Sequence, residues 1–450
     1  MPNKFYKKYI RIPPNESIDI RDIMPIIHHP LFQRLLHISQ LGTTLTVFPG
    51  ANHNRFEHAL GVYGKTIRFC RKMVESGFLT KYEAKNVSLF GLMHDIGHGP
   101  FSHGIEELTQ LSGDEDENGL VVLKQMKDVV EKSGGDYEFL KKIFKHQTPL
   151  FHIVMDKNVG MDKLDYLERD TYHTGFGQRP DIESLFNYLI YLKGKLVIDK
   201  KSLEAAKQMQ RLYIYMYKEV YLHKSALISQ RFLQKMIAML IAINKINPVR
   251  SLARAKGASL KDLGEATSYG INTSELWQMN DNELLALIYT NKNQDLNFLY
   301  NCYKNRILPR TGLVIRLKNR EFKERIAGKK IKVIGEDLKF FQKFMKQARP
   351  VDLESLESKI ANLINIPAYR VVIVPTLTPW RFVPQDILYH DNGRILSLKD
   401  TQKEYFEALK SEMSDYLAVR VCIVGDRGVI YKNSLKIYRI ISDKVGKENG

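Results

Sequence analysis

The stretch GLMHDIGHGPFSH, Gly91–His103, ends an apolar segment with three histidines and an aspartate. A lone histidine is more often a satisfied core or surface residue, but three beside an aspartate in so short a window favour a site. On a helix, neighbours such as His94 and Asp95 point about 100° apart, so an ion between them needs ligands from other helices. The glycines and the proline break the helix and let a ligand approach the backbone. The stretch therefore favours a functional site inside a helical bundle, and a metal at that site would need further ligands from elsewhere in the chain.

Helical periodicity dominates residues 22–247, where apolar residues recur three and four positions apart. The segment LGTTLTVFPGANHNR, residues 41–55, interrupts this pattern with Gly, Pro and Asn. We expect it to be a loop that delivers its last three residues to the head of the next helix. A long helix or a broken helical pair is expected over residues 202–245, after a short strand-like KLVID.

The pattern changes beyond residue 248. Alternating apolar runs predict strands at residues 312–317, 369–375 and 417–424. Helical segments separate these runs, at residues 352–363 and 401–409. We therefore expect a mainly α protein with an N-terminal segment (1–21), an all-helical core (22–247) and a smaller C-terminal α+β lobe (248–450).

Composition narrows the class of partner. The 450 residues carry a formal charge of +18, which favours nucleotides, nucleic acid or an acidic membrane surface. A lysine-rich solvated surface explains the charge equally well, because acids are interspersed with the bases. The three cysteines form no C-x-x-C pair, which argues against a disulfide framework or a thiolate zinc site and fits the cytoplasm. The N-terminus has no signal-peptide core and the best apolar run, Met236–Ile243, is far short of a bilayer span, so we expect a soluble protein.

Two further segments offer ligands. NHNRFEHALGVYG places His58 on a helix among apolar neighbours, although a buried histidine with a backbone partner would fit as well. In MDKLDYLERDTYH, the residues Asp162, Tyr166 and Asp170 lie at i, i+4 and i+8, on one stripe of a helix. A solvated face explains the charges of that stripe but not a tyrosine between two acids. Imidazole and carboxylate donors suit Mn, Mg, Fe, Co or Zn and do not decide between them.

These residues carry a family resemblance. The order His58, His94-Asp95, Asp162 matches the H…HD…D metal signature of the HD superfamily. The strings FPGANHNRFEHALGV, HDIGHGPFSH, MDKLDYLERDTYHTG and VYLHK resemble its deoxynucleoside triphosphate triphosphohydrolase branch, which includes a vertebrate restriction factor. The resemblance is dense over residues 22–224. Four ordered motifs at these spacings are far more specific than the two-letter HD motif alone.

The resemblance implies a set of roles. The metal ligands would be His58, His94, Asp95 and Asp162. The groups beside the α-phosphate would be His98 and His103, with Glu117 as a third catalytic candidate. The phosphate oxygens would be held by Arg55 and Lys163. The sugar and its 3′-hydroxyl would be read by Gln40, Leu41, Tyr166 and Asp170, and Tyr221 would exclude a 2′-hydroxyl.

The sequence departs from the family in three places. The usual His-Glu pair after the HD motif aligns with Asp116-Glu117, so one histidine is missing. An arginine and a histidine that contact phosphates in the restriction factor align with Tyr213 and Tyr217. The regulatory nucleotide loop is replaced by RIPPNESI, so we expect no dependence on GTP of the vertebrate kind.

We expect metal-dependent hydrolysis of deoxynucleoside triphosphates to deoxynucleoside and inorganic triphosphate. A metal acting as Lewis acid, with His and Lys or Arg partners, supplies what hydrolysis of such an anion needs. Two other classes stay open. One is an HD phosphohydrolase of nucleoside monophosphates or single-stranded nucleic acid, which the +18 charge would help; the other is a non-catalytic nucleotide-binding or defence-associated subunit, against which the complete ligand set argues. The resemblance also implies a homo-oligomer, in pool control or in defence against phage.

Overall fold

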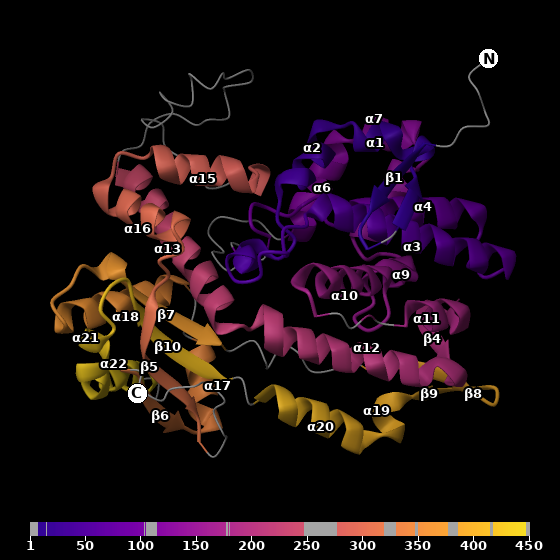
Figure 1. Ribbon diagram of the computed structural model, residues 1–450. Coiled ribbons are helices and arrows are strands. Elements are labelled where there is room, and N and C mark those ends of the chain that lie inside the picture. Colours follow the sequence, from indigo (N-terminus) through magenta and orange to yellow (C-terminus); the bar gives the residue numbers. More distant parts are fainter. Residues whose placement is uncertain are drawn as a thin grey trace.

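The computed structural model describes residues 8–446 except 15, 103, 105–114, 177–178, 180, 247–276, 319–329, 347–349, 377–385 and 415–416. Helices form most of this described part, and the strands form three small sheets (Figure 1). The predicted mainly α class is therefore confirmed.

The first half of the chain is a bundle of helices. In chain order these are α1 (Met24–Ile27), α2 (Pro30–Gln33), α3 (Arg55–Glu75), α4 (Lys81–Met93), α6 (Glu115–Gln125), α7 (Lys127–Lys132), α8 (Tyr137–Phe144), α9 (His152–Met155), α10 (Met161–Thr174) and α11 (Ile182–Tyr188). Helix α3 packs against both α4 and α10. These three helices position the residues of the predicted metal signature.

The start of α3 is fixed by its cap. The side chain of Asn54 accepts a hydrogen bond from the backbone N–H of Glu57 (3.0 Å), one of the donors that a first helical turn leaves unpaired. The predicted loop over residues 41–55 contains a 3₁₀ turn, Gly42–Thr46, and leads directly into α3. The sequence therefore placed both the loop and the helix start correctly.

The long helix predicted over residues 202–245 is interrupted once. Helix α12 (Leu203–Met216) passes into a π-helical turn, Tyr217–Tyr221, and the chain continues as α13 (Lys224–Ile246). Such turns are rare and frequently occur at functional sites. The alternative of a broken helical pair is the one that the structure confirms.

Helix α13 also corrects the expectation that no apolar run is long enough for a membrane. Among the described helices, α13 is the one that is long and apolar enough to cross a membrane. The stretch that meets these two criteria is Lys224–Ile243, with a mean hydropathy of 1.4. Most of that stretch, 67%, is buried inside the protein. Its residues Phe232, Leu233 and Met236 belong to a core shared with later helices and strands, which accounts for the apolar composition.

The second half of the chain mixes helices and strands. Its described helices are α15 (Asp281–Thr290), α16 (Gln294–Lys304), α17 (Leu338–Lys346), α18 (Pro350–Leu363), α19 (Leu398–Thr401), α20 (Lys403–Ser414), α21 (Gly428–Lys432) and α22 (Ser434–Gly446). One sheet has the order β6-β5-β10-β7, from β5 (Arg310–Leu317), β6 (Lys332–Glu336), β7 (Val371–Thr376) and β10 (Ala418–Ile423). The three strands predicted beyond residue 248 are therefore confirmed.

The expectation of an all-helical core over residues 22–247 is wrong. A second sheet, of order β3-β4-β8-β9, contains β3 (Leu189–Leu192) and β4 (Lys195–Asp199), which is the predicted KLVID strand. Its other strands are β8 (Leu388–Asp391) and β9 (Arg394–Ser397), from the far end of the chain (Figure 1). Strand β4 pairs in parallel with β8, a contact across about 190 residues that no local sequence pattern encodes. A third sheet is the hairpin of β1 (Tyr9–Ile12) and β2 (Glu16–Asp19).

The hydrophobic cores cross the two halves of the chain. The largest core combines the N-terminal helices with buried side chains from the second half, among them Trp277, Ile387, Leu398 and Phe406. Another core lies between the β6-β5-β10-β7 sheet and helices α17, α18 and α22. The helical bundle around the predicted site is therefore completed by residues that follow it in the sequence.

Candidate metal centre

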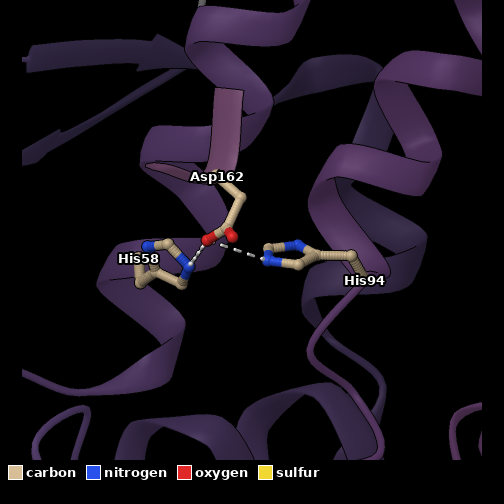
Figure 2. Close-up of side chains that lie close together, drawn as sticks. All are labelled: His58, His94 and Asp162. Carbon is tan, nitrogen blue, oxygen red and sulfur yellow. Dashed lines mark ion pairs between the residues drawn. The ribbon is translucent and has the colours of Figure 1, made fainter. Parts of the chain in front are cut away.

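Three residues of the predicted metal signature converge from three helices. His58 lies on α3, His94 is the C-terminal cap of α4, and Asp162 lies in the first turn of α10. Figure 2 shows the Asp162 carboxylate between the two imidazoles. Its Oδ1 atom lies 3.1 Å from His58 Nε2 and 3.6 Å from His94 Nε2, and one donor atom from each residue falls within 4.8 Å of the others.

Asp95 completes the set of four predicted ligands. Its carboxylate oxygens lie 3.2 Å from His94 Nε2 and 3.4 Å from His58 Nε2. The same carboxylate forms an ion pair with Arg55, and both side chains are buried. Burial raises the pKa of Asp95, but the charges of Arg55 and His94 outweigh burial and hold that pKa well below its usual range. Asp95 is therefore an ionised oxygen donor.

The donor atoms suit a cation. His94 Nδ1 lies 2.9 Å from the carbonyl oxygen of Gly91, a partner that requires the proton on Nδ1. The buried Nε2 atom of His94 has no hydrogen-bond partner among the described atoms and lies beside the carboxylates of Asp95 and Asp162. Burial lowers the pKa of His94, but the charges of these two carboxylates outweigh burial and raise it, so the position is one that favours a positive charge. Two imidazole nitrogens and two carboxylates form a donor set for a divalent metal, and the identity of the metal is left open by this chemistry.

A third carboxylate, Asp165, orients His58 from behind. Its Oδ2 atom lies 2.8 Å from His58 Nδ1, which leaves His58 Nε2 directed at Asp162. The carboxylate also pairs with Lys65 (2.8 Å) and Arg169 (2.8 Å), so its charge is balanced although it is fully buried. Histidines that bind metals in proteins commonly donate the N–H of their second ring nitrogen to such a carboxylate.

Asp165 was not among the predicted site residues, although its spacing from Arg169 in the sequence is a signal. Asp165 and Arg169 lie four positions apart on α10, the spacing of an intrahelical ion pair. That pair lies on the face of α10 that packs against α3, where Gly61 leaves no side chain in the way. A buried acid one turn after a predicted ligand is the position from which a carboxylate can support a histidine.

The three predicted catalytic residues, His98, His103 and Glu117, differ in how they lie relative to the metal signature. His98 is buried, and its Nε2 atom lies 3.3 Å from Asp95 Oδ1, so the structure brings it to the metal signature. His103 lies outside the described residues. Glu117 is exposed on α6 and forms no ion pair with the described residues of the metal signature. The structure therefore joins one of the three candidates to the site.

The two predicted phosphate ligands are both buried and already engaged. Arg55 donates to Ser102 Oγ (2.7 Å) in addition to its ion pair with Asp95. Lys163 donates to a backbone carbonyl (2.7 Å) and its Nζ lies 3.4 Å from the ring centroid of Tyr213. Burial lowers the pKa of Lys163 to about 7, against the opposing effect of nearby aspartates.

The residues predicted to read the sugar gather around Asp170. Its Oδ2 atom accepts a hydrogen bond from Tyr221 Oη (2.5 Å), and its Oδ1 atom lies 2.8 Å from His53 Nε2. Tyr166 lies one turn earlier on α10, and burial raises its pKa well above the usual value. His53 was not predicted as part of this group; the loop that carries it was.

The two remaining predicted contacts lie on the loop before α3. The side-chain Oε1 of Gln40 is buried without a hydrogen-bond partner among the described atoms, and Leu41 is half-buried. The backbone N–H of Gln40 donates to the carbonyl of His53 (3.1 Å), which holds this loop beside the Asp170 group. An unpaired buried acceptor is costly unless a ligand satisfies it, so Gln40 suits a binding role.

A metal signature of two histidines and two aspartates inside a helical bundle defines the HD class. Residues 55–170 match the HD domain family model. The resemblance to the triphosphohydrolase branch is confirmed by similarity to curated proteins. A deoxynucleoside triphosphate triphosphohydrolase SAMHD1 homolog of Dictyostelium discoideum is 33% identical over 221 residues, which are 45% of this chain and 42% of that protein.

Other relatives carry less specific names. The protein YwfO of Bacillus subtilis, described as uncharacterized, is 30% identical over 231 residues, which are 48% of this chain and 52% of YwfO. The matched part thus spans about half, or less, of these relatives. A solved phosphohydrolase from Bacteroides thetaiotaomicron has the same fold with a TM-score of 0.69 at 23% identity, covering 93% of this chain and all of that one. A hypothetical protein from Aquifex aeolicus has a TM-score of 0.62 at 20% identity, covering 96% of this chain and all of that one.

Proposed function

We propose that this protein hydrolyses deoxynucleoside triphosphates to deoxynucleoside and inorganic triphosphate. The observation that carries the proposal is the common placement of two groups on α10: Asp162 lies in the first turn beside His58 and His94, and Asp170 lies eight residues later with Tyr221. Eight residues of helix rise by about 12 Å, and positions i, i+4 and i+8 share one stripe, so both groups lie along the same side of α10. The SAMHD1 name of several relatives supports this substrate class.

The metal ligands would be His58, His94, Asp95 and Asp162. A bound divalent metal supplies Lewis acidity at a phosphoryl oxygen and lowers the pKa of water. The protein supplies the rest. His98 Nε2 is held 3.3 Å from Asp95, at the edge of the signature, where its imidazole can give a proton to the departing nucleoside oxygen.

Phosphate recognition would fall to Lys163 and Arg55. Burial lowers the pKa of Lys163 to about 7. A polyanion bound beside the Nζ atom would favour the protonated form of Lys163, so the lysine would carry a full positive charge in the complex. Arg55 already neutralises Asp95 and would add its charge to the same region. Both cations are fixed before substrate arrives, so little side-chain entropy is lost on binding.

Selection of deoxyribose would come from Asp170 and Tyr221. The Asp170 carboxylate is the acceptor that a 3′-hydroxyl needs, and Tyr221 is already hydrogen-bonded to it. A ribose 2′-hydroxyl next to that contact would meet the Tyr221 ring. We propose that nucleoside triphosphates with a 2′-hydroxyl are poor substrates for this reason.

The decisive experiment is a product assay on the purified protein with Mn²⁺ or Mg²⁺. The substrates are each deoxynucleoside triphosphate, its ribonucleotide, its monophosphate and single-stranded DNA, with products resolved as nucleoside, triphosphate or oligomer. We expect inorganic triphosphate from deoxynucleoside triphosphates alone. The variants His94→Ala and Asp162→Ala should lose more than about 100-fold in turnover, and His37→Ala, an exposed histidine, serves as the matched control.

Three outcomes would contradict the proposal. Release of inorganic phosphate from monophosphates, or cleavage of DNA, would assign the same metal site to a different HD reaction. Equal rates for wild type and Asp162→Ala would remove the metal site from the reaction. Metal content that Asp162→Ala leaves unchanged, measured by mass spectrometry, would contradict the ligand assignment itself.

We propose further that the reaction needs no GTP and that the protein is a homo-oligomer. The first follows from the replacement of the regulatory loop by RIPPNESI, and the second rests on the family resemblance alone. A rate that stays at background until GTP is added would contradict the first. A monomer mass in solution, by light scattering with and without nucleotide, would contradict the second.

A further inference from the structure

An acid from the second half of the chain binds two loops that lie next to the metal centre. Asp281, the first residue of α15, accepts a hydrogen bond from the backbone N–H of Phe101 (2.6 Å) on one carboxylate oxygen. The other oxygen accepts from both the backbone N–H (3.0 Å) and the hydroxyl (2.6 Å) of Ser39. One buried carboxylate thus joins three donors that lie 180 to 242 residues away in the sequence.

The segment that Asp281 holds is strained. Phe101 and Ser102 have φ values of 57° and 52°, in the left-handed region that residues with a side chain rarely adopt. A conformation of that kind persists only where the surroundings impose it. The carboxylate of Asp281 binds the N–H of the first left-handed residue and is therefore one of the contacts that impose it.

The strained turn connects directly to the metal signature. Ser102 Oγ accepts a hydrogen bond from Arg55 Nε (2.7 Å) and donates one to the carbonyl of Ser39 (2.7 Å). Arg55 in turn pairs with Asp95. Asp281 therefore binds both the turn at Phe101 and the loop at Ser39. Ser102 connects that turn and that loop to Arg55, and Arg55 pairs with Asp95.

Arg34 makes the same connection from the other side. Its guanidinium donates to the carbonyls of Ile96 (3.1 Å) and His98 (2.8 Å) in the segment after α4. It also donates to the carbonyls of Trp277 (2.9 Å) and Met279 (2.9 Å), just before α15. One side chain thus fastens the backbone around His98 to the chain segment that carries Asp281.

We propose that Asp281 and Arg34 are positioning residues of the catalytic centre, through which the segment 277–281 sets the placement of His98 and of the Arg55–Asp95 pair. Neither residue touches the four metal ligands' donor atoms. The proposal deepens the function proposed above and rests on it for its kinetic consequence, whereas its structural consequence is independent of the substrate.

A purely structural role for α15 is the competing explanation, and the helix offers a matched control. Glu283 lies two residues after Asp281 and forms a capping box with Asn280; its charge acts on Arg34, but it makes no hydrogen bond to the described residues of the metal-site loops. Loss of Glu283 weakens the start of α15 but leaves the contacts to Ser39 and Phe101 in place. The variants Asp281→Asn and Glu283→Gln remove the same charge from the same helical turn.

The first measurement is hydrogen–deuterium exchange on the metal-free full-length protein. In Asp281→Asn, an amide N–H2 replaces one acceptor oxygen, so peptides covering residues 94–102 and 38–41 should exchange about tenfold faster than in wild type. Glu283→Gln should change exchange within α15 and leave those two regions as in wild type. Arg34→Lys, which cannot reach four carbonyls, should repeat the Asp281→Asn pattern around residues 96–98.

The second measurement is steady-state kinetics with a deoxynucleoside triphosphate. Asp281→Asn should lower kcat about tenfold or more while KM changes less than about threefold, because the residue acts on catalytic groups rather than on substrate. Protection of residues 94–102 that equals wild type in folded Asp281→Asn would overturn the proposal. Equal losses of kcat in Asp281→Asn and Glu283→Gln would overturn it too. Failure of the wild type to hydrolyse any deoxynucleotide would instead overturn the proposed function and leave the exchange test standing.

Discussion

Asp165 shows how a single buried charge supports the metal centre. It accepts from His58 Nδ1 and is paired with Lys65 and Arg169, all within 2.8 Å. Burial alone would raise the pKa of Asp165, but the two cations hold the pKa well below its usual range. The carboxylate is therefore charged, and it turns the imidazole of His58 so that Nε2 faces the site.

We predict that Asp165→Asn weakens metal binding. An amide can present its N–H2 group to His58 Nδ1 in place of an acceptor, and it removes the negative charge that Lys65 and Arg169 share. Metal affinity should therefore fall about 10- to 100-fold. Stability should fall by about 3 kcal/mol or more, because one side of a buried ion network is removed. Isothermal titration with Mn²⁺ and urea unfolding measure the two effects.

An exposed ion pair supplies the control for this prediction. Arg68 and Glu183 form a close pair at the surface, with side-chain exposures of 51% and 68%. Glu183→Gln should change the free energy of unfolding by less than about 1 kcal/mol and leave Mn²⁺ affinity unchanged. Equal metal affinity in Asp165→Asn and wild type would show that His58 is oriented without Asp165.

Helices α3 and α10 approach each other closely at Gly61. A Cβ atom on Gly61 would lie 2.0 Å from Asp165 Oδ1 and 2.1 Å from a guanidinium nitrogen of Arg169. Glycine is therefore required by space at this position, and α3 accepts its lower helix propensity there. The close approach of the two helices is what lets Asp165 reach His58.

We predict that Gly61→Ala disrupts this crossing. The added methyl group must displace a charged pair that has no free volume around it, so stability should fall by about 3 kcal/mol and metal affinity should fall with it. Thermal unfolding with and without Mn²⁺ tests both. Gly119→Ala on α6 is the matched control, because its added Cβ would lie 3.4 Å from the ring of Phe144, and it should keep wild-type metal affinity.

Local sequence patterns predicted the elements that carry the ligands. The i, i+4, i+8 stripe of Asp162, Tyr166 and Asp170 has its expected place on α10, because helical spacing is a property of neighbouring residues. The strand KLVID was also predicted, but its partner β8 was not. Likewise, nothing near Asp281 indicates that it binds Phe101, since a contact across 180 residues is decided by how the chain folds back. Local patterns therefore predicted the helices that carry the candidate ligands, but not the long-range contacts that hold these helices in place.

At the scale of the whole molecule, a buried acid joins the long helix to the C-terminal sheet. Glu357 on α18 is fully buried and pairs with Lys235 (2.5 Å) and Arg231 (3.4 Å), both on α13. It also accepts from the backbone N–H of Ile373 on β7 (2.8 Å). The side chain thus connects α13, α18 and β7 at one point.

We predict that Glu357→Ala destabilises the protein by about 3–5 kcal/mol, because it leaves two cations buried without their carboxylate. Replacement of Lys235 by Met in the same chain should recover part of the loss, since one unpaired charge disappears. Differential scanning calorimetry measures both variants. A double variant no more stable than Glu357→Ala would show that the lost contact to Ile373 dominates instead.

The parallel pairing of β4 with β8 has a consequence for any shortened form of this protein. The pairing joins Ile198 to Tyr389 and Asp199 to His390, and it covers one side of β4. Without β8, that side would present free N–H and C=O groups next to the buried residues Val197 and Ile198. Such an edge recruits strands from other molecules. We therefore expect removal of the second half of the chain to give self-associating material, because β4 would lose the strand that covers its edge.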